Sequence, residues 1–94
     1  MTVRESYVEA QIGKYVKYKK GLYLKLGQNG LPDRIIILKG PRIAFLEIKR
    51  PGGKPTKLQH YYLRTLSALG CNAGWVDNVL DGKKFIDNME QDDG

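Results

Sequence analysis

Asp33, Glu47 and Lys49 are the residues of this chain whose types and spacing best suit a metal-ion site. Two carboxylates held about 5 Å apart repel each other unless a positive charge lies between them. Mg²⁺ prefers hard oxygen ligands, and one or two carboxylates usually hold it in proteins. Carboxylates that converge beside a lysine therefore indicate a divalent metal site with a basic companion.

A predicted β-hairpin brings these three residues together. Its strands are residues 33–38 (DRIIIL) and 42–49 (RIAFLEIK), which are rich in Ile, Leu and Phe and are joined by a short connection containing Gly and Pro. If the last residue of the first strand pairs with the first residue of the second, Asp33 lies opposite Glu47. Lys49 shares their side of the sheet, because side chains two residues apart share a face. The second strand is apolar on both faces as far as Glu47, which is typical of a central strand covered on both sides.

A helix is predicted before the hairpin, from Thr2 to about Lys19. Thr2 and Glu5 have the spacing of a capping box, in which Glu follows a hydroxyl residue by three positions. The apolar residues predicted to form its buried face recur at helical spacing: Val8, Ile12, Tyr15 and Val16. Glu5 lies at the head of this stripe and Glu9 at its edge. Glu5 is either a capping residue alone or also a third acid that reaches the metal site.

A second helix is predicted after the hairpin, from the capping-box match of Thr56 and Gln59 to Gly70. Its predicted apolar face consists of Leu58, Tyr62, Leu66 and Leu69. Gln59 can reach back to the backbone N–H of Thr56, and it can also contact the site from the first turn. His60, the single histidine, points about 100° away from Gln59 and is not expected to join the site.

The remaining elements complete an α/β fold. Residues 22–26 predict an edge strand, and residues 73–76 predict a strand parallel to an earlier one, because a helix precedes it. Residues 81–89 predict a short helix that packs Phe85, Ile86 and Met89, and residues 90–94 are expected to be disordered. The prediction is a single domain over 1–94, with its core at about 2–79. Its mixed β-sheet is flanked by helices in the order α-β-β-β-α-β, followed by a short C-terminal helix.

Length and composition agree with one small domain. The 94 residues are 41% hydrophobic and 28% charged, which is ordinary for a globular chain. No apolar run approaches the roughly 20 residues of a membrane span, and no signal peptide is evident, so no membrane association and a cytoplasmic location, in a bacterium or an infected host cell, are expected. The single cysteine, Cys71, cannot form an internal disulfide and is expected to be buried.

The charge pattern favours a polyanionic partner. The net charge is +6, although the last ten residues (FIDNMEQDDG) contain four acids and no base. Such a basic surface attracts nucleic acids and makes their binding salt-dependent. The residues expected to contact DNA are Lys14, Lys17, Arg50, Lys54 and Lys57. A basic surface and a carboxylate–lysine site together predict a nuclease.

The order of these motifs resembles a known superfamily. Along the chain they are Gly30-x-Pro32-Asp33, then Glu47-x-Lys49 after a hairpin, then Gln59 at the start of a helix. This order resembles the PD-(D/E)XK nucleases and, more narrowly, the VRR-NUC (virus-type replication-repair nuclease) domain of the stand-alone phage or bacterial type. The details that narrow it are GLPD, LEIKRPGGKPTKLQ and the return into a strand over 70–76. The resemblance covers about residues 2–79.

The resemblance implies a restriction-endonuclease-like core and a metal-dependent, structure-selective endonuclease. The expected substrate is branched DNA such as the four-way Holliday junction, cut by a homodimer with Mg²⁺, for which Mn²⁺ can substitute. The implied metal ligands are Asp33, Glu47 and an acid of the first helix, Glu5 with Glu9 as second choice, and the backbone carbonyl of Ile48 can add a ligand. Lys49 corresponds to the motif lysine and Gln59 to a supporting glutamine.

Other functions are compatible with the same residues. A flap or end-directed nuclease would use the same site, and a non-catalytic DNA-binding module would use only the basic surface. A small protein-interaction domain would carry its charge for solubility alone. Asp33, Glu47 and Lys49 could also be a surface ion-pair cluster, worth about 0–1 kcal/mol per pair. The apolar strand around Glu47 argues against that last interpretation.

Overall fold

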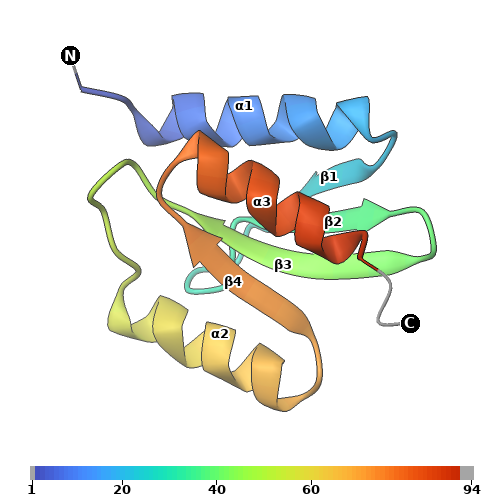
Figure 1. Cartoon of the computed structure of the whole chain (residues 1–94). Coiled ribbons are helices and arrows are strands. Elements are labelled where there is room, and N and C mark those ends of the chain that lie inside the picture. The colour runs from blue at the N-terminus through green and yellow to red at the C-terminus, as the bar shows by residue number, and fades with distance from the viewer. Residues whose placement is uncertain (1, 92–94) are drawn as a thin grey trace.

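A computed structural model describes residues 2–91 of the chain. Its centre is a four-stranded sheet in the order β1-β2-β3-β4, in which only the β3–β4 pair is parallel. Helices α1 and α3 lie together on one face of the sheet, and α2 lies on the other (Figure 1). The elements are α1 (Glu5–Tyr18), β1 (Leu22–Lys25), β2 (Arg34–Leu38), β3 (Arg42–Ile48), α2 (Lys57–Ala68), β4 (Asn72–Val76) and α3 (Val79–Met89). The predicted order of elements and mixed α/β class are confirmed.

The predicted hairpin register is also confirmed. Leu38 pairs with Arg42 and Ile35 with Phe45. The strands are each one residue shorter than expected at the site end, since β2 begins after Asp33 and β3 ends before Lys49. β1 is the predicted edge strand, and β4 runs parallel to β3 as predicted.

The core lies between the sheet and the layer formed by α1 and α3. Alternate residues of the two central strands point into it, because successive side chains of a strand face opposite ways. The fully buried members are Val8, Ile12, Val16, Ile36, Ala44, Leu46, Ile48 and Ile86. Ile86 and Met89 of α3 are buried and Phe85 is half-buried against them, as the sequence predicted. The hydrophobic core therefore includes residues of α3.

The start of α1 differs from the prediction. Its N-cap is Arg4, not Thr2, and the cap makes no side-chain hydrogen bond. Glu5 is the first helical residue and therefore carries its charge in the positive first turn of the helix. The capping-box spacing of Thr2 and Glu5 is present in the sequence, but the N-cap lies two residues later than it indicated.

Both ends of α2 agree with the sequence. Thr56 accepts a hydrogen bond from the backbone N–H of Gln59, and the Gln59 side chain accepts one from the backbone N–H of Thr56. At the other end Gly70 has a φ of +92°, and the N–H of Cys71 donates to the carbonyl of Leu66. This is the Schellman arrangement, which favours glycine because the residue just after the C-cap adopts a left-handed backbone conformation.

The predicted apolar face of α2 is not buried. Leu63 is the buried residue of this helix, whereas Leu58 and Leu69 are exposed and Leu66 is only half-buried. The periodicity identified a helix but not its inner face, because α2 packs on the narrow edge strand β4 rather than across the sheet. Cys71, just beyond α2, is half-exposed rather than buried.

One face of the sheet remains largely open. Apolar side chains of β1, β2 and β3 point away from α1 and α3, and α2 does not reach the turn end of these strands. We call this surface the open sheet face: Leu22, Leu24, Ile35, Ile37, Ile43 and Phe45. Leu22 is 56% exposed and Ile43 is 52% exposed. The second hairpin strand is central, as predicted, but it is covered on both sides only at its Glu47 end, and the turn end is exposed on one face.

The C-terminal residues are more ordered than predicted, as far as the structure describes them. Glu90 pairs with Lys19 at 2.7 Å, and the carbonyl of Gln91 accepts a hydrogen bond from Arg42 at 3.2 Å. The rest of the predicted disordered tail, 92–94, lies outside the described residues. Within 2–91 no helix combines the length and the apolar character that a bilayer crossing requires.

Candidate active site

Asp33 and Glu47 meet where β2 begins and β3 ends. The backbone N–H of Ile48 donates to Oδ2 of Asp33 at 2.9 Å, which ties the aspartate to the strand that carries Glu47. Asp33 itself lies just outside the ladder, so its side chain replaces a backbone carbonyl as the acceptor at this point. The hairpin register therefore brings the two predicted carboxylates together.

Glycine is required at the loop that leads into Asp33. Gly30 is buried with a φ of +85°, and a β-carbon there would lie 2.5 Å from Cγ of Leu58 and 3.1 Å from Cε2 of Tyr62. Only glycine allows α2 to approach this loop so closely, since both the backbone conformation and the space exclude a side chain. The Gly-x-Pro-Asp segment thus sets the distance between the loop and the first turns of α2.

Glu47 is the most buried ionisable residue of the described chain, with 1% of its surface exposed. Its Oε2 accepts a hydrogen bond from Nε2 of Gln59 at 3.1 Å and lies 3.3 Å from Nζ of Lys49. Its Oε1 is buried and has no hydrogen-bond partner among residues 2–91. A buried carboxylate oxygen without a donor is costly, so a cation is the expected companion.

Burial and its acidic neighbour change the acidity of Glu47. Burial raises its pKa most, and the carboxylate of Asp33 raises it further, whereas the ammonium of Lys49 lowers it. The net effect raises the pKa from 4.5 to about 7. Lys49 alone therefore does not neutralise the pair, and a second positive charge would fit the same place.

Gln59 performs both of the roles that the sequence left open. Its Oε1 accepts from the backbone N–H of Thr56 at 2.8 Å, while its Nε2 donates to Glu47 at 3.1 Å. The capping box therefore fixes which end of the amide points at the carboxylate. Lys49, 16% exposed at its side chain, completes the group of four residues that the structure brings together at this site.

The two candidate acids of α1 do not join this group. Glu9 forms an ion pair with Arg34 at 2.9 Å, and Arg34 also lies over the ring of Tyr23 at 4.3 Å. Glu5 is exposed in the first turn of the helix. Within the described residues no three Asp, Glu, His or Cys side chains are grouped to hold a metal ion. The pairing of Glu9 favours Glu5 as the acid available to a ligand.

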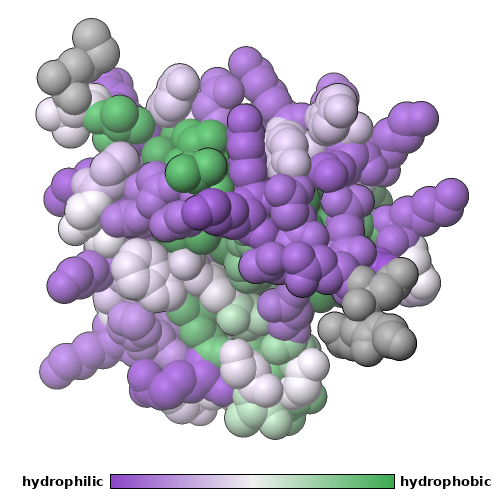
Figure 2. Space-filling view, viewed as in Figure 1, coloured by the Kyte–Doolittle hydropathy of each residue, from purple (hydrophilic) through white to green (hydrophobic). Residues whose placement is uncertain are grey.

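The predicted DNA-contacting residues fall into two groups. Arg50, Lys54 and Lys57 are exposed on the loop after β3 and on the first residue of α2, beside the site. Lys14 and Lys17 are exposed on α1, in the helical layer on the other face of the sheet. That layer presents mostly hydrophilic side chains (Figure 2). Three of the five therefore lie on the segment between Lys49 and Gln59, two residues of the site.

Asp77 is a residue of the site region that the sequence prediction missed. Its Oδ2 accepts from the backbone N–H of Gly52 at 3.1 Å, and its Oδ1 accepts from Asn78 at 2.8 Å. These hydrogen bonds lower its pKa and fasten the loop that carries Arg50 and Lys54 to the end of β4. Its position directly after a parallel strand, at the edge where such sheets place their sites, was the available signal.

The residues at the site fit a divalent cation. Asp33 and Glu47 supply two carboxylates, one with a buried oxygen that lacks a partner. The backbone at Ile48 lies between them and can add a carbonyl oxygen, and this hard-oxygen donor set suits Mg²⁺ or Mn²⁺ rather than a soft metal.

Comparisons with known proteins agree with the geometry. No family model matches the chain. The chain is 37% identical over 71 residues to "Putative nuclease p44" of Acyrthosiphon pisum secondary endosymbiont phage 1. The aligned region covers 72% of this chain and 76% of that protein. A solved structure described as a VRR_NUC domain superposes with a TM-score of 0.81 and 28% identity, covering 88% of this chain and 94% of its own.

Fold, motif order and relatives lead to one assignment. The four-stranded mixed sheet with three helices matches the VRR_NUC domain over nearly its whole length. The phage relative shares more than a third of the aligned residues. The chain belongs to the VRR-NUC family of nucleases.

Proposed function

We propose that the chain is a Mg²⁺-dependent endonuclease that cuts branched DNA, with the four-way junction as its preferred substrate. The observation that carries the proposal is Glu47, a buried carboxylate with one unpartnered oxygen, held beside Asp33 by Lys49 and Gln59. Such a carboxylate is unfavourable in the free protein and becomes useful when a cation and a phosphate arrive. Burying it without that purpose would cost stability.

Asp33, Glu47 and the carbonyl of Ile48 would hold the metal, with Glu5 as the acid supplied by α1. When bound, Mg²⁺ supplies charge neutralisation at the phosphate and lowers the pKa of a coordinated water. Lys49 keeps a hydrogen-bond donor beside Glu47 and can orient the attacking water or stabilise negative charge as it develops on the phosphate. Gln59 keeps the Glu47 carboxylate in one orientation, since its own amide is fixed by the helix cap.

A second copy of the chain is proposed to cover the open sheet face. Tyr23 is not available to such an interface, because it packs against α1 and its hydroxyl donates a hydrogen bond to the Glu9 carbonyl. The open sheet face offers contiguous exposed apolar residues such as Leu22 and Ile43 instead. Two sites related by this interface could act on two strands of a junction.

Light scattering tests the dimer directly. Ile43→Lys is expected to give a monomer, because it places a charge within the proposed interface. Tyr18→Lys is the matched control, since Tyr18 is 77% exposed on α1 and should leave the dimer intact. A wild-type monomer at working concentration would remove the dimer from the proposal.

Cleavage of labelled DNA tests the catalytic proposal. Four-way junction, flap and linear duplex are incubated with wild type, Lys49→Ala and Asp33→Ala, in Mg²⁺, Mn²⁺ or EDTA. The expected result is metal-dependent cutting of the junction that both variants lose while they still bind. Faster cutting of the flap would replace the junction by a flap substrate, and binding without cutting under every metal would leave a DNA-binding module.

A further inference from the structure

Trp75 lies directly beside the catalytic glutamate. In the parallel pairing of β3 and β4, Trp75 is the partner of Glu47. Paired residues of neighbouring strands point to the same face, with backbones about 4.8 Å apart. β4 is the edge of the sheet, and the indole is 37% exposed there. An exposed tryptophan therefore borders the carboxylates on the side where no further strand lies.

The His60 side chain packs against Trp75. The imidazole of His60 meets the indole edge to face, with ring centroids 6.5 Å apart and planes at 88°. His60 reaches the indole from the first turn of α2, one residue after Gln59, and is half-buried. We call these two side chains the Trp75–His60 platform. The direction of His60, which points away from Glu47, is what brings it onto Trp75.

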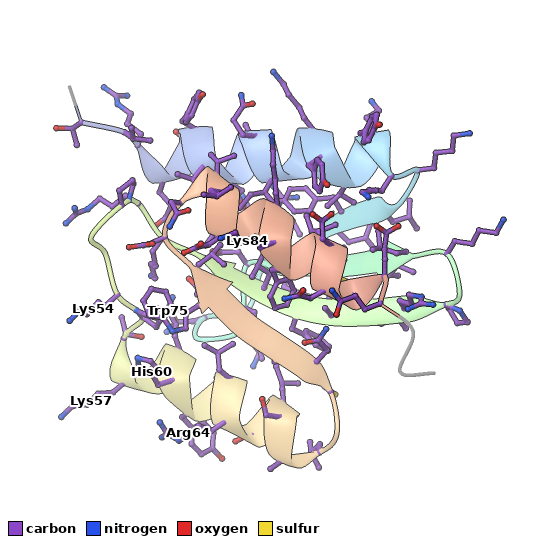
Figure 3. The ribbon with its side chains drawn as sticks, viewed as in Figure 1. Lys54, Lys57, His60, Arg64, Trp75 and Lys84 are labelled. Carbon is purple, nitrogen blue, oxygen red and sulfur yellow. The ribbon has the colours of Figure 1, made fainter. Side chains whose placement is uncertain are left out.

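Basic residues lie along the segment that contains the platform, although the Glu47 carboxylate borders Trp75 on β3. No Asp or Glu occurs from residue 48 to residue 76, a stretch that contains Lys49, Arg50, Lys54, Lys57 and Arg64. Lys57 and Arg64 flank His60 at helical spacings of three and four, so the three side chains form one stripe along α2. Both are exposed, as is Lys54 in the preceding loop. In Figure 3 Lys54, Lys57, His60 and Trp75 come from the same side of the molecule.

We propose that the Trp75–His60 platform stacks an unpaired base of the DNA next to the cleaved phosphate, and that Lys57 and Arg64 hold the phosphates of that strand. This rests on the proposed nuclease function and specifies its substrate. Bases inside a duplex are already stacked on each other and cannot reach the indole, whereas a base released at a branch or in a single strand can. Stacking on an aromatic side chain is largely independent of sequence. The platform therefore selects DNA with an unpaired nucleotide at the branch.

Trp75 is the only tryptophan of the chain, so its emission reports on the platform without a label. Metal-free protein in EDTA is titrated with a single-stranded oligonucleotide, a junction with unpaired nucleotides at its centre, and a blunt duplex of equal length. Anisotropy of end-labelled DNA measures binding in parallel. The expected result is quenching by the first two DNAs but not by bound duplex. Binding of the first two with unchanged emission, or equal quenching by duplex, would overturn the proposal.

Substitution gives a second, independent measurement. Trp75→Leu is expected to weaken binding of the single strand and the unpaired junction about tenfold and duplex binding very little, while Trp75→Phe retains most of the affinity. Tyr18→Leu, which removes an exposed aromatic from α1, is the control and should change none of the three. Circular dichroism establishes that each variant is folded. Equal affinity of Trp75→Leu and wild type for the single strand would count against the platform.

The outcomes separate this inference from the nuclease assignment. Metal-dependent cleavage by a protein whose Trp75 emission does not change on DNA binding would support the nuclease proposal and contradict the platform proposal. Quenching by unpaired DNA in a protein that does not cleave under any metal would support the platform proposal and contradict the catalytic proposal. Because the fluorescence titration contains no metal, its result does not depend on whether the protein cleaves DNA.

Discussion

Gln59 of α2 donates a 3.1 Å hydrogen bond to Glu47 of β3, while the other end of the same amide closes the helix cap at 2.8 Å. One side chain thus joins the start of a helix to a buried carboxylate. The amide cannot turn over without losing both contacts, since its oxygen would then face a carboxylate and its NH₂ group would face a backbone N–H. Helix initiation and orientation of the site are therefore the same local structure.

Replacing Gln59 by Glu separates these two tasks. Gln59→Glu keeps an acceptor for the cap but puts a second negative charge beside Glu47, so DNA cleavage should fall at least tenfold. Thr56→Ala is the matched change, because it weakens the cap by about 1 kcal/mol and leaves the donor to Glu47 in place. Single-turnover cleavage and urea unfolding of both variants make the comparison. Wild-type cleavage by Gln59→Glu would mean that the hydrogen bond to Glu47 has no role in the reaction.

The raised pKa of Glu47 predicts a pH-dependent stability. The folded protein binds this proton more tightly than the unfolded chain, because the pKa is about 7 in the fold and 4.5 without it. Stability contributed by this group is thus complete below pH 4.5 and is lost as the pH rises to about 7, by on the order of 3 kcal/mol. Glu47→Gln should remove this loss and be more stable than wild type at pH 8.

Urea unfolding in EDTA at pH 5 and pH 8 measures the effect. The advantage of Glu47→Gln over wild type should be small at pH 5 and largest at pH 8. Added Mg²⁺ at pH 8 should raise the midpoint of wild type but not that of the variant, since a ligand stabilises only the protein that binds it. An advantage that is the same at both pH values would show that the carboxylate is not desolvated in solution.

Glu9 and Glu5 should respond differently to removal of their charge. Glu9→Gln breaks a half-buried ion pair with Arg34 and should cost about 1 kcal/mol of stability with little change in Mg²⁺ dependence. Glu5→Gln should leave stability nearly unchanged, because Glu5 is exposed, and should raise the Mg²⁺ concentration needed for cleavage. Thermal unfolding and Mg²⁺ titration of cleavage test both. The opposite pattern would identify Glu9 as the helix acid.

Salt dependence distinguishes the two basic groups. Each phosphate contact contributes about one unit to the slope of binding against the logarithm of salt concentration. Lys54→Ala with Lys57→Ala should therefore lower the slope by about two. Lys14→Ala with Lys17→Ala removes the same charge from α1, on the far side of the sheet, and should have the smaller effect. If the α1 pair has the larger effect, the DNA lies against the helical layer.

The sequence predicted the hairpin well because its register follows from local chemistry. A short connection with Gly and Pro between two apolar runs favours one register of strand pairing, and that register brings Asp33 close to Glu47. The capping box at Thr56 was equally readable, since both of its hydrogen bonds are local. What these features share is that each is decided within a few residues of itself.

Features set by packing were not readable in the same way. The apolar stripe of α2 does not reveal that the helix contacts a single edge strand, because the spacing of leucines does not say what lies opposite them. The pairing of Glu9 with Arg34 joins residues 25 positions apart, and the partnership of Trp75 with Glu47 depends on a parallel crossover. These relationships exist only once the sheet is assembled.

The small number of buried residues in α2 affects how easily this helix opens. This helix buries one residue, Leu63, and touches the fold mainly through β4. Segments with few buried contacts open at lower free energy than the rest of a domain, and their amides exchange with solvent first. The helix that carries Gln59 is therefore expected to open before the sheet that carries Asp33 and Glu47. Hydrogen exchange along α2 would then measure how often the glutamine leaves its carboxylate.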